Sequence, residues 1–247
     1  MKPTRGIGES PPLLRRYCED PTKTQSWKGL RGDAEGRTAY IELSEALIAA
    51  QRGLCCYCEI NLIVPLDRQI EHVLSREQFP DKALDPANIL AGCVGGSQPA
   101  LAAERDHYLA PPKGNLICGQ KKLNAETLDP RTLPIDVPIF VVATDGRMVV
   151  DTAICDTSGI PQQAAYRARD VLGLNAPRLV NARKKIMEQL SEAPVEPLPQ
   201  REFVAREQLL PDATGKLMPW FTTRRSHFGA VSEKILAEPP QDWIGRS

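Results

Sequence analysis

Four cysteines in this chain have the residue type and spacing to bind one metal ion. Cys55 and Cys58 are separated by two residues, the spacing with which two thiolates bind a tetrahedral zinc from a tight turn. Cys93 and Cys118 follow in segments that contain glycine, and glycine permits the backbone bends that bring a sulfur onto a metal. We expect these four cysteines to form a structural zinc site.

Two other interpretations of the cysteines stay open. A Cys-x-x-Cys pair can be a thiol redox motif, but that motif normally lies at a strand-to-helix junction of a βαβ unit, which the residues around Cys55 do not resemble. Redox chemistry also leaves Cys93 and Cys118 unexplained. The cysteines can instead be unrelated buried side chains. Cys56, inside the first pair, can compete with a neighbour as a ligand. Outside the predicted site remain Cys18, Cys56 and Cys155.

A Glu-His pair lies between the cysteine pairs. Glu71 can bind a divalent cation while the imidazole of His72 takes a proton from water, and metal-assisted phosphodiester hydrolysis needs both tasks. Histidines are more often packed or surface residues than catalysts, so the context of His72 carries this prediction. Residues 69–74 alternate like a short strand, in which adjacent side chains point to opposite faces. The pair can act on one phosphate only if the strand ends or bulges there.

The segment that leads to Cys93 is compatible with two structures. Asp85 and Pro86 are typical of a helix start, with an aspartate cap and a proline in the first position. Alternatively, a turn is followed by a strand over residues 88–92 that pairs with residues 70–74. The loop between the two strands then carries Arg76. The residues of this segment do not decide between the two.

Periodic patterns predict the elements that hold these motifs. Residues 38–52 have helical spacing, and Gly53 follows as a stop. Residues 138–151 predict a β-hairpin around Asp145-Gly146. Two helices come next, one over residues 162–172 and one that begins with Pro177 after Asn175 as its cap. Residues 194–199 predict a linker.

The composition limits the function without deciding it. The 247 residues include 31 basic and 31 acidic side chains, which argues against a sequence-blind DNA coat but not against a local basic groove. No apolar run has the length of a membrane span, and the polar, proline-rich start is not typical of a signal peptide. We therefore expect a cytoplasmic protein with no membrane partner, in which reduced cysteines favour metal binding.

The order of these motifs resembles the zinc-stabilised HNH nucleases. The resemblance is carried by Cys55-x-x-Cys58, Ile70-Glu71-His72, Asn88-Ile89-Leu90, Cys93 and Cys118-Gly119-x-x-Lys122. Within these nucleases, residues 55–59 (CCYCE) and 172–179 (LGLNAPRL), followed by Arg183, are similar to the PtuB-type endonucleases. Those enzymes accompany an ABC-class ATPase, PtuA, in Septu and retron anti-phage systems. The resemblance covers residues 54–130 well, with a second patch over residues 166–183.

This resemblance assigns roles to the site residues. His72 would be the general base and Glu71 would stand beside a catalytic Mg²⁺ or Mn²⁺. Asn88, placed on a strand, would orient the His72 loop or help to hold that ion, and Lys122 would contact a phosphate. The third HNH position, often His or Asn, is not evident among the residues near Lys122. Those residues are Ile117, Gly119 and Gln120, while Asp106 or His107 could supply the missing ligand.

The implied fold is α+β, a ββα-metal HNH nuclease core with a four-cysteine zinc knuckle, flanked by α-helices and a small β-hairpin. We expect a basic irregular arm (1–39), a zinc-stabilised core (40–130) and a mostly helical region for nucleic-acid or partner docking (131–247). The implied function is a metal-dependent endonuclease, with DNA the favoured substrate, that serves anti-phage defence with a PtuA-type ATPase. A zinc module that binds nucleic acid or a partner without catalysis is the alternative, because the third position is missing. Nucleic-acid contacts are expected from Arg76, Lys121 and Arg183.

Overall fold

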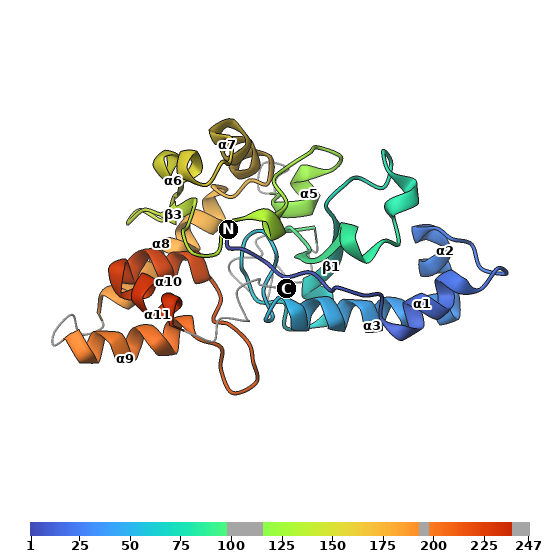
Figure 1. The fold of residues 1–247 in the computed structure, drawn as a ribbon, viewed down its shortest axis with the longest axis horizontal. Coiled ribbons are helices and arrows are strands. Elements are labelled where there is room, and N and C mark those ends of the chain that lie inside the picture. Colours follow the sequence, from blue (N-terminus) through green and yellow to red (C-terminus); the bar gives the residue numbers. More distant parts are fainter. Residues whose placement is uncertain (98–115, 193–197, 239–247) are drawn as a thin grey trace.

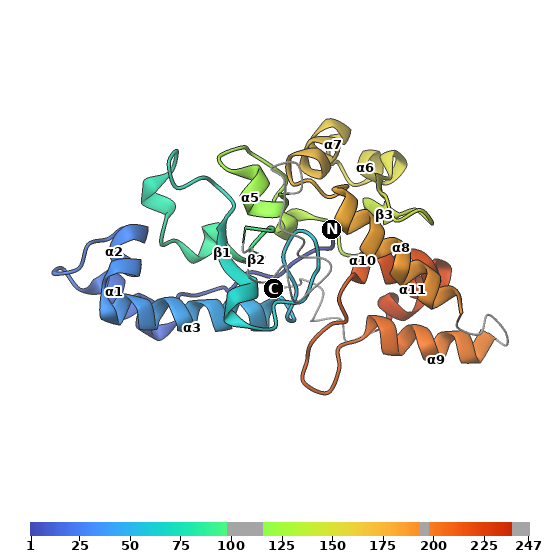
Figure 2. The ribbon, with the colours of Figure 1, turned by 180° about the vertical axis from the view of Figure 1, so that it is seen from behind.

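A small antiparallel sheet and a short helix lie between two groups of helices. The structure is a computed structural model that describes residues 1–97, 116–192 and 198–238. Helices α1 (Pro12–Glu19), α2 (Trp27–Gly32) and α3 (Ala34–Ala50) form one end, and α9 (Leu198–Leu209), α10 (Phe221–Phe228) and α11 (Ala230–Ala237) form the other (Figures 1 and 2). Strands β1 (Arg68–His72) and β2 (Ile89–Cys93) and helix α5 (Cys118–Lys122) lie in the middle.

Two helices and the start of a third lie within residues 12–39, so the prediction of an irregular arm over residues 1–39 is wrong for this part. Pro12 is the first residue of α1, where a missing N–H breaks no intrahelical hydrogen bond, so it starts the helix. Ser26 caps α2 by accepting a hydrogen bond from the N–H of Gly29. Leu14 and Leu30 are fully buried, and α1 and α2 both pack on α3.

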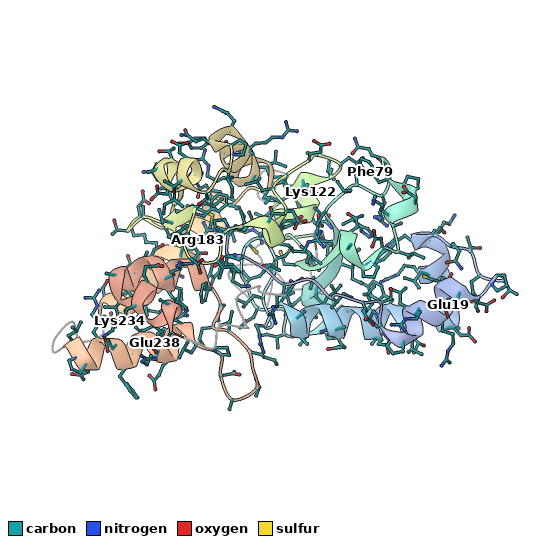
Figure 3. The ribbon with its side chains drawn as sticks, viewed as in Figure 1. Glu19, Phe79, Lys122, Arg183, Lys234 and Glu238 are labelled. Carbon is teal, nitrogen blue, oxygen red and sulfur yellow. The ribbon has the colours of Figure 1, made fainter. Side chains whose placement is uncertain are left out.

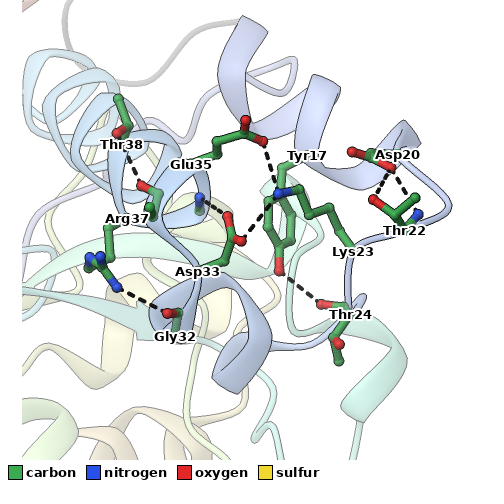
Figure 4. Close-up of polar contacts among 12 residues, drawn as sticks. Tyr17, Asp20, Thr22, Lys23, Thr24, Gly32, Asp33, Glu35, Arg37 and Thr38 are labelled. Atoms are coloured by element: carbon green, nitrogen blue, oxygen red, sulfur yellow. Dashed lines mark hydrogen bonds and ion pairs between the residues drawn. The ribbon is translucent and has the colours of Figure 1, made fainter.

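Helix α3 begins four residues before the predicted start at residue 38 because Asp33 caps it. The Asp33 side chain accepts a hydrogen bond from the N–H of Gly36. The ammonium of Lys23 lies 3.2 Å from Asp33 and 2.9 Å from Glu35, joining the α1–α2 turn to the start of α3 (Figure 4). The helix ends at Ala50, just before the expected position.

Strands β1 and β2 pair in the register that places the Glu-His pair opposite two buried side chains. Glu71 pairs with Leu90 and His72 with Ile89, which confirms the hairpin interpretation. The alternative, a helix that starts at Asp85 and Pro86, is correct for one turn only. Asp85 accepts a hydrogen bond from the N–H of Ala87, and the short 3-10 turn ends where β2 begins.

The C-terminal region begins with the predicted hairpin, β3 (Phe140–Val142) and β4 (Met148–Val150), and continues with α6 (Thr152–Thr157), α7 (Gln162–Val171) and α8 (Pro177–Ser191). Asn175 is not the cap of α8, contrary to prediction. Its side chain accepts a hydrogen bond from the N–H of Met148 and donates one to the carbonyl of the same residue, which ties the hairpin to the start of α8.

Two hydrophobic clusters stabilise the molecule. The larger one extends from α1 through the sheet to α8, and the smaller one is formed mainly by α9, α10 and α11. Leu54, beside the first cysteine pair, is fully buried in the smaller cluster, so it anchors the cysteine loop to the C-terminal helices. None of the helices in the described ranges is long and apolar enough to cross a membrane.

Candidate functional site

The four predicted cysteine ligands lie together in the buried centre of the molecule. The Sγ atoms of Cys55, Cys58, Cys93 and Cys118 are all within 4.8 Å of one another. Cys55 lies 3.9 Å from Cys118, and Cys58 lies 3.7 Å from Cys93. Metal–sulfur bonds of about 2.3 Å in a regular tetrahedron separate the sulfurs by about 3.8 Å, so this cluster has the geometry to bind zinc.

Local backbone geometry brings the four sulfurs together. The loop that carries Cys55 and Cys58 closes with a backbone hydrogen bond from Cys55 to Ile60. Cys93 ends β2, and its N–H donates to the sulfur of Cys55 at 3.3 Å. Cys118 begins α5 with a φ of 52°, a left-handed conformation that is uncommon outside glycine. Cys56, Cys18 and Cys155 lie outside the cluster.

Glu59 fastens the cysteine loop to the C-terminal helices. It is buried, and its carboxylate accepts hydrogen bonds from the backbone N–H and the hydroxyl of Thr222 on α10. The α-amino group of Met1 lies 3.3 Å from the same carboxylate. Although burial opposes ionisation, these charged and hydrogen-bonded partners leave the pKa of Glu59 below its ordinary value.

Glu71 and His72 border one open cleft of about 1020 Å³. Adjacent residues of a strand point to opposite faces, but β1 ends at His72, which lets both residues reach the same space. The strand end expected from the sequence is therefore present. The cleft lies between β1, α2, α5 and the β1–β2 loop, and its lining includes Trp27, Gln69, Glu71, His72, Arg76 and Gly119.

His72 is held as a neutral imidazole with a defined tautomer. Its Nε2 lies 2.9 Å from the carbonyl oxygen of Ala83, which can only accept, so Nε2 carries the proton and Nδ1 keeps its lone pair. Burial lowers the pKa of His72 to about 4, against the opposite effect of the Ala83 hydrogen bond. Nδ1 is therefore available as a proton acceptor at neutral pH.

Glu71 forms an ion pair with a buried lysine, Lys122. Its Oε1 lies 3.1 Å from the Nζ of Lys122 and 3.4 Å from the hydroxyl of Tyr57. Lys122 also donates to the carbonyl oxygen of His72 at 2.8 Å. Burial raises the pKa of Glu71 above its ordinary value, while the charge and the hydrogen bond of Lys122 act in the opposite direction.

Lys122 does not have the position expected of a phosphate contact. It is only 2% exposed, and it is not among the described residues that line the cleft. Figure 3 shows it on α5, in the interior of the molecule. Its contacts are those of a residue that fixes β1 to α5.

Asn88 orients the loop after β1. Its side-chain oxygen accepts from the N–H of Leu74 at 2.7 Å, and its amide nitrogen donates to the carbonyl oxygens of Leu74 and Lys82. Asn88 is 3% exposed and is not among the described residues that line the cleft, so the geometry fits the first of its two expected roles, loop orientation, better than metal binding.

Gly119, one of the residues near the expected third position of the motif, lies directly beside the carboxylate of Glu71. A Cβ built on Gly119 would be 1.9 Å from Oε2 of Glu71 and 3.2 Å from Nε2 of Gln69. The Gln69 side chain accepts a hydrogen bond from Gln120 at 2.9 Å. A carboxylate oxygen and two amides therefore surround this glycine. Of these groups, the carboxylate oxygen suits a hard divalent cation that keeps several waters. Asp106 and His107 lie outside the described residues.

Trp27 is a cleft residue that the sequence interpretation missed. Its ring meets the His72 imidazole edge-on, with centroids 4.6 Å apart, and the guanidinium of Arg76 lies 5.5 Å from its centroid. Helix α2 carries Trp27 from a segment that was predicted to be irregular. Ser26, a residue type that favours the helix N-cap, was the available sign of that helix.

The three basic residues expected to contact nucleic acid lie in different environments. Arg76 is exposed and lines the cleft. Lys121 is exposed but its side chain lies over Gly173, outside the cleft lining. Arg183 on α8 is 1% exposed, donates to the carbonyl of Leu174 at 2.6 Å and is not among the described residues that line the cleft, so the structure does not support its predicted phosphate contact.

Comparison with curated proteins identifies a relative from Escherichia coli named "Retron Ec83 putative HNH endonuclease". The two sequences are 29% identical over 215 residues, which span 76% of this chain and 79% of the relative. No protein-family model matches the chain. The similarity supports an HNH nuclease, the enzyme class predicted from the sequence. The mixed helical and antiparallel fold with a four-cysteine cluster is consistent with it.

Proposed function

We propose that this protein is a metal-dependent HNH endonuclease that hydrolyses phosphodiester bonds of nucleic acid, with DNA as the favoured substrate. The observation that carries the proposal is the shared cleft of Glu71 and His72, in which a carboxylate and a neutral imidazole face one space. The arrangement of β1, β2 and α5 around the four-cysteine cluster agrees with a ββα-metal core.

In this mechanism His72 is the general base. The Ala83 carbonyl keeps the proton on Nε2, so Nδ1 takes the proton of the attacking water, a contribution of typically about 10²–10⁴-fold. Glu71 would hold Mg²⁺ or Mn²⁺, which when bound neutralises charge on the phosphate and on the leaving oxygen. Asn88 and Lys122 keep the strand end and the following loop in place.

The four-cysteine cluster is proposed to hold a structural zinc ion. Its sulfur separations of 3.7 and 3.9 Å match a zinc tetrahedron rather than disulfides. None of the seven cysteines forms a disulfide, which fits a reducing, cytoplasmic location. Zinc would add stability by joining a loop, a strand end and a helix start that have few local contacts of their own.

The proposed biological role is an effector of anti-phage defence. The retron in the name of the E. coli relative supports this role, and the PtuB-like motifs support a PtuA-type ABC ATPase as the partner. Co-expression of the chain with a PtuA-type ATPase from the same genome tests the partner. We expect the two proteins to co-purify, and separate elution at micromolar concentrations would contradict the assignment.

Cleavage assays with one matched variant test the nuclease. The purified protein is incubated with plasmid DNA, and separately with RNA, in the presence of Mg²⁺. We expect His72→Ala to lose cleavage, while His227→Ala, a histidine on α10, retains it. Unchanged cutting by His72→Ala would refute the assignment of the base.

A non-catalytic zinc module remains a second candidate, and Gly119 is the observation that favours it. The third position carries no side chain that can bind a cation. This candidate predicts that the wild-type protein binds nucleic acid without cutting it in Mg²⁺ or Mn²⁺, with or without the ATPase.

A further inference from the structure

We propose that Gln69 is a ligand of the catalytic cation and, together with Glu71, supplies the oxygen donors that the third position lacks. This inference rests on the proposed nuclease function. It concerns a residue two positions before Glu71 that is outside the motifs described above.

The strand places Gln69 and Glu71 on one face. Side chains two residues apart in a strand point the same way, and both residues line the cleft beside Gly119. The partner of Gln69 across the sheet is Gly92, which has no side chain to fill the space next to it. The amide of Gln69 is therefore free to lie beside the carboxylate of Glu71.

The space at Gly119 excludes a third ligand at this position of α5. A Cβ there would come within 1.9 Å of Oε2 and 2.9 Å of the carboxyl carbon of Glu71. Contacts this short do not occur in folded proteins, so any larger residue would displace the Glu71 carboxylate. An additional protein donor must then come from another position that borders the same cleft.

The two oxygens of Glu71 have different surroundings. Oε1 receives the hydrogen bonds of Lys122 and Tyr57, whereas Oε2 is the atom nearest to the Gly119 position. The positive charge of Lys122 balances the negative charge of Glu71. A cation bound at Oε2 therefore lies beside an ion pair that is nearly neutral overall. Such a cation needs further oxygen ligands, and Mg²⁺ typically completes its shell with waters and substrate phosphate.

Gln69 has an oxygen suited to this task. Its Oε1 accepts a hydrogen bond from Gln120 at 2.9 Å, while its Nε2 lies 3.2 Å from the position of a Cβ on Gly119, so cation binding requires a half-turn of the Gln69 amide. That half-turn brings Oε1 to the side of Oε2 of Glu71 and turns Nε2 toward Gln120, whose side-chain oxygen can then accept a hydrogen bond. A neutral amide adds a donor without adding charge, which predicts weak cation binding that a phosphate strengthens.

Binding of Mn²⁺ to the zinc-loaded full chain tests the inference, by electron paramagnetic resonance and calorimetry, with zinc content measured in each sample. We expect Gln69→Ala to weaken Mn²⁺ binding by about tenfold or more. Gln69→Glu should bind Mn²⁺ more tightly than wild type because it adds a charged oxygen at the same place. Gln163→Ala, on α7, is the matched control and should bind like wild type.

The outcomes separate this inference from the proposed function. If Glu71→Gln loses Mn²⁺ while Gln69→Ala and Gln69→Glu both bind like wild type, Gln69 is not a ligand and the nuclease assignment stands. If the wild-type protein cleaves nucleic acid but binds Mn²⁺ no differently from Glu71→Gln, the cation site is elsewhere and the inference is overturned. If wild type neither binds Mn²⁺ nor cleaves, both proposals fail.

Discussion

The ammonium of Lys122 lies 3.1 Å from Oε1 of Glu71 and 2.8 Å from the carbonyl oxygen of His72. One side chain of α5 therefore holds both residues of the Glu-His pair. The ion pair is buried, with Lys122 2% and Glu71 7% exposed. A buried ion pair loses much of its value when one partner is removed, because the remaining charge stays away from water.

Lys122→Met should therefore destabilise the protein by about 3 kcal/mol, the usual scale for leaving a buried charge unpaired. Urea unfolding at neutral pH, with zinc present, measures this change. Lys121→Met is the control, because Lys121 is exposed and its loss should change the free energy of unfolding by less than about 0.5 kcal/mol. If both variants change the free energy of unfolding by the same small amount, the Lys122–Glu71 ion pair contributes little to stability.

Cys118→Ser should lower the zinc content of the purified protein and its thermal stability together. The serine removes one of four thiolates around a buried ion, and a structural zinc contributes directly to folding. Elemental analysis and a thermal melt measure both quantities. Cys18→Ser should leave both unchanged, since Cys18 lies outside the cluster. Full zinc content in Cys118→Ser would contradict the four-cysteine site.

The burial of His72 predicts a pH-dependent stability. Its folded pKa is about 4, below the ordinary value of 6.5, so the unfolded chain binds more protons between these values. Full stability is present above about pH 6.5 and is lost as the pH falls toward 4.

Replacing His72 with glutamine isolates this effect. Between pH 6.5 and 5, the wild-type protein in Mg²⁺-free buffer should lose about 1.5 kcal/mol more than His72→Gln. Denaturant unfolding at each pH measures the difference. Protonation of the cysteine cluster is common to both proteins and cancels. If the free energy of unfolding depends on pH in the same way in the two proteins, the pKa of His72 is not lowered by folding.

Trp27 is expected to position His72 rather than to react. Trp27→Ala removes the edge contact and opens the cleft beside the imidazole, so cleavage should fall by about tenfold or more. The acid limb of the pH–rate profile should also move toward higher pH, because a more hydrated imidazole has a higher pKa. Trp27→Phe should restore much of the cleavage rate and of the wild-type pH–rate profile. A lower rate with an unchanged pH profile would indicate a purely structural role.

Arg76 and Arg183 should respond differently in nucleic-acid binding. Arg76→Ala removes an exposed cation of the cleft, so the slope of log K against log salt should decrease by about one if it contacts a phosphate. Arg183→Met should leave that slope unchanged and reduce stability instead, because its guanidinium is buried. A salt slope that depends on Arg183 would contradict its interior position.

The sequence by itself determined the features that depend on local spacing. The Cys55-x-x-Cys58 turn, the β3–β4 hairpin and α7 follow from residue order, because turns, caps and periodicity act over a few neighbours. The local sequence left the β1–β2 pairing open. The Glu71-His72 pair was also recognisable from its immediate context, including the condition that its strand must end there.

Only the tertiary structure decided which side chains face the cleft and which are buried behind it. Lys122 and Arg183 are ordinary basic residues in the sequence, yet packing encloses both, since a charge can enter the interior when a carboxylate or carbonyls lie within reach. Trp27 reaches His72 through the packing of α2 on α3, a contact between residues 45 positions apart in sequence. Such contacts depend on how helices and strands pack together, and residue spacing along one segment does not specify them.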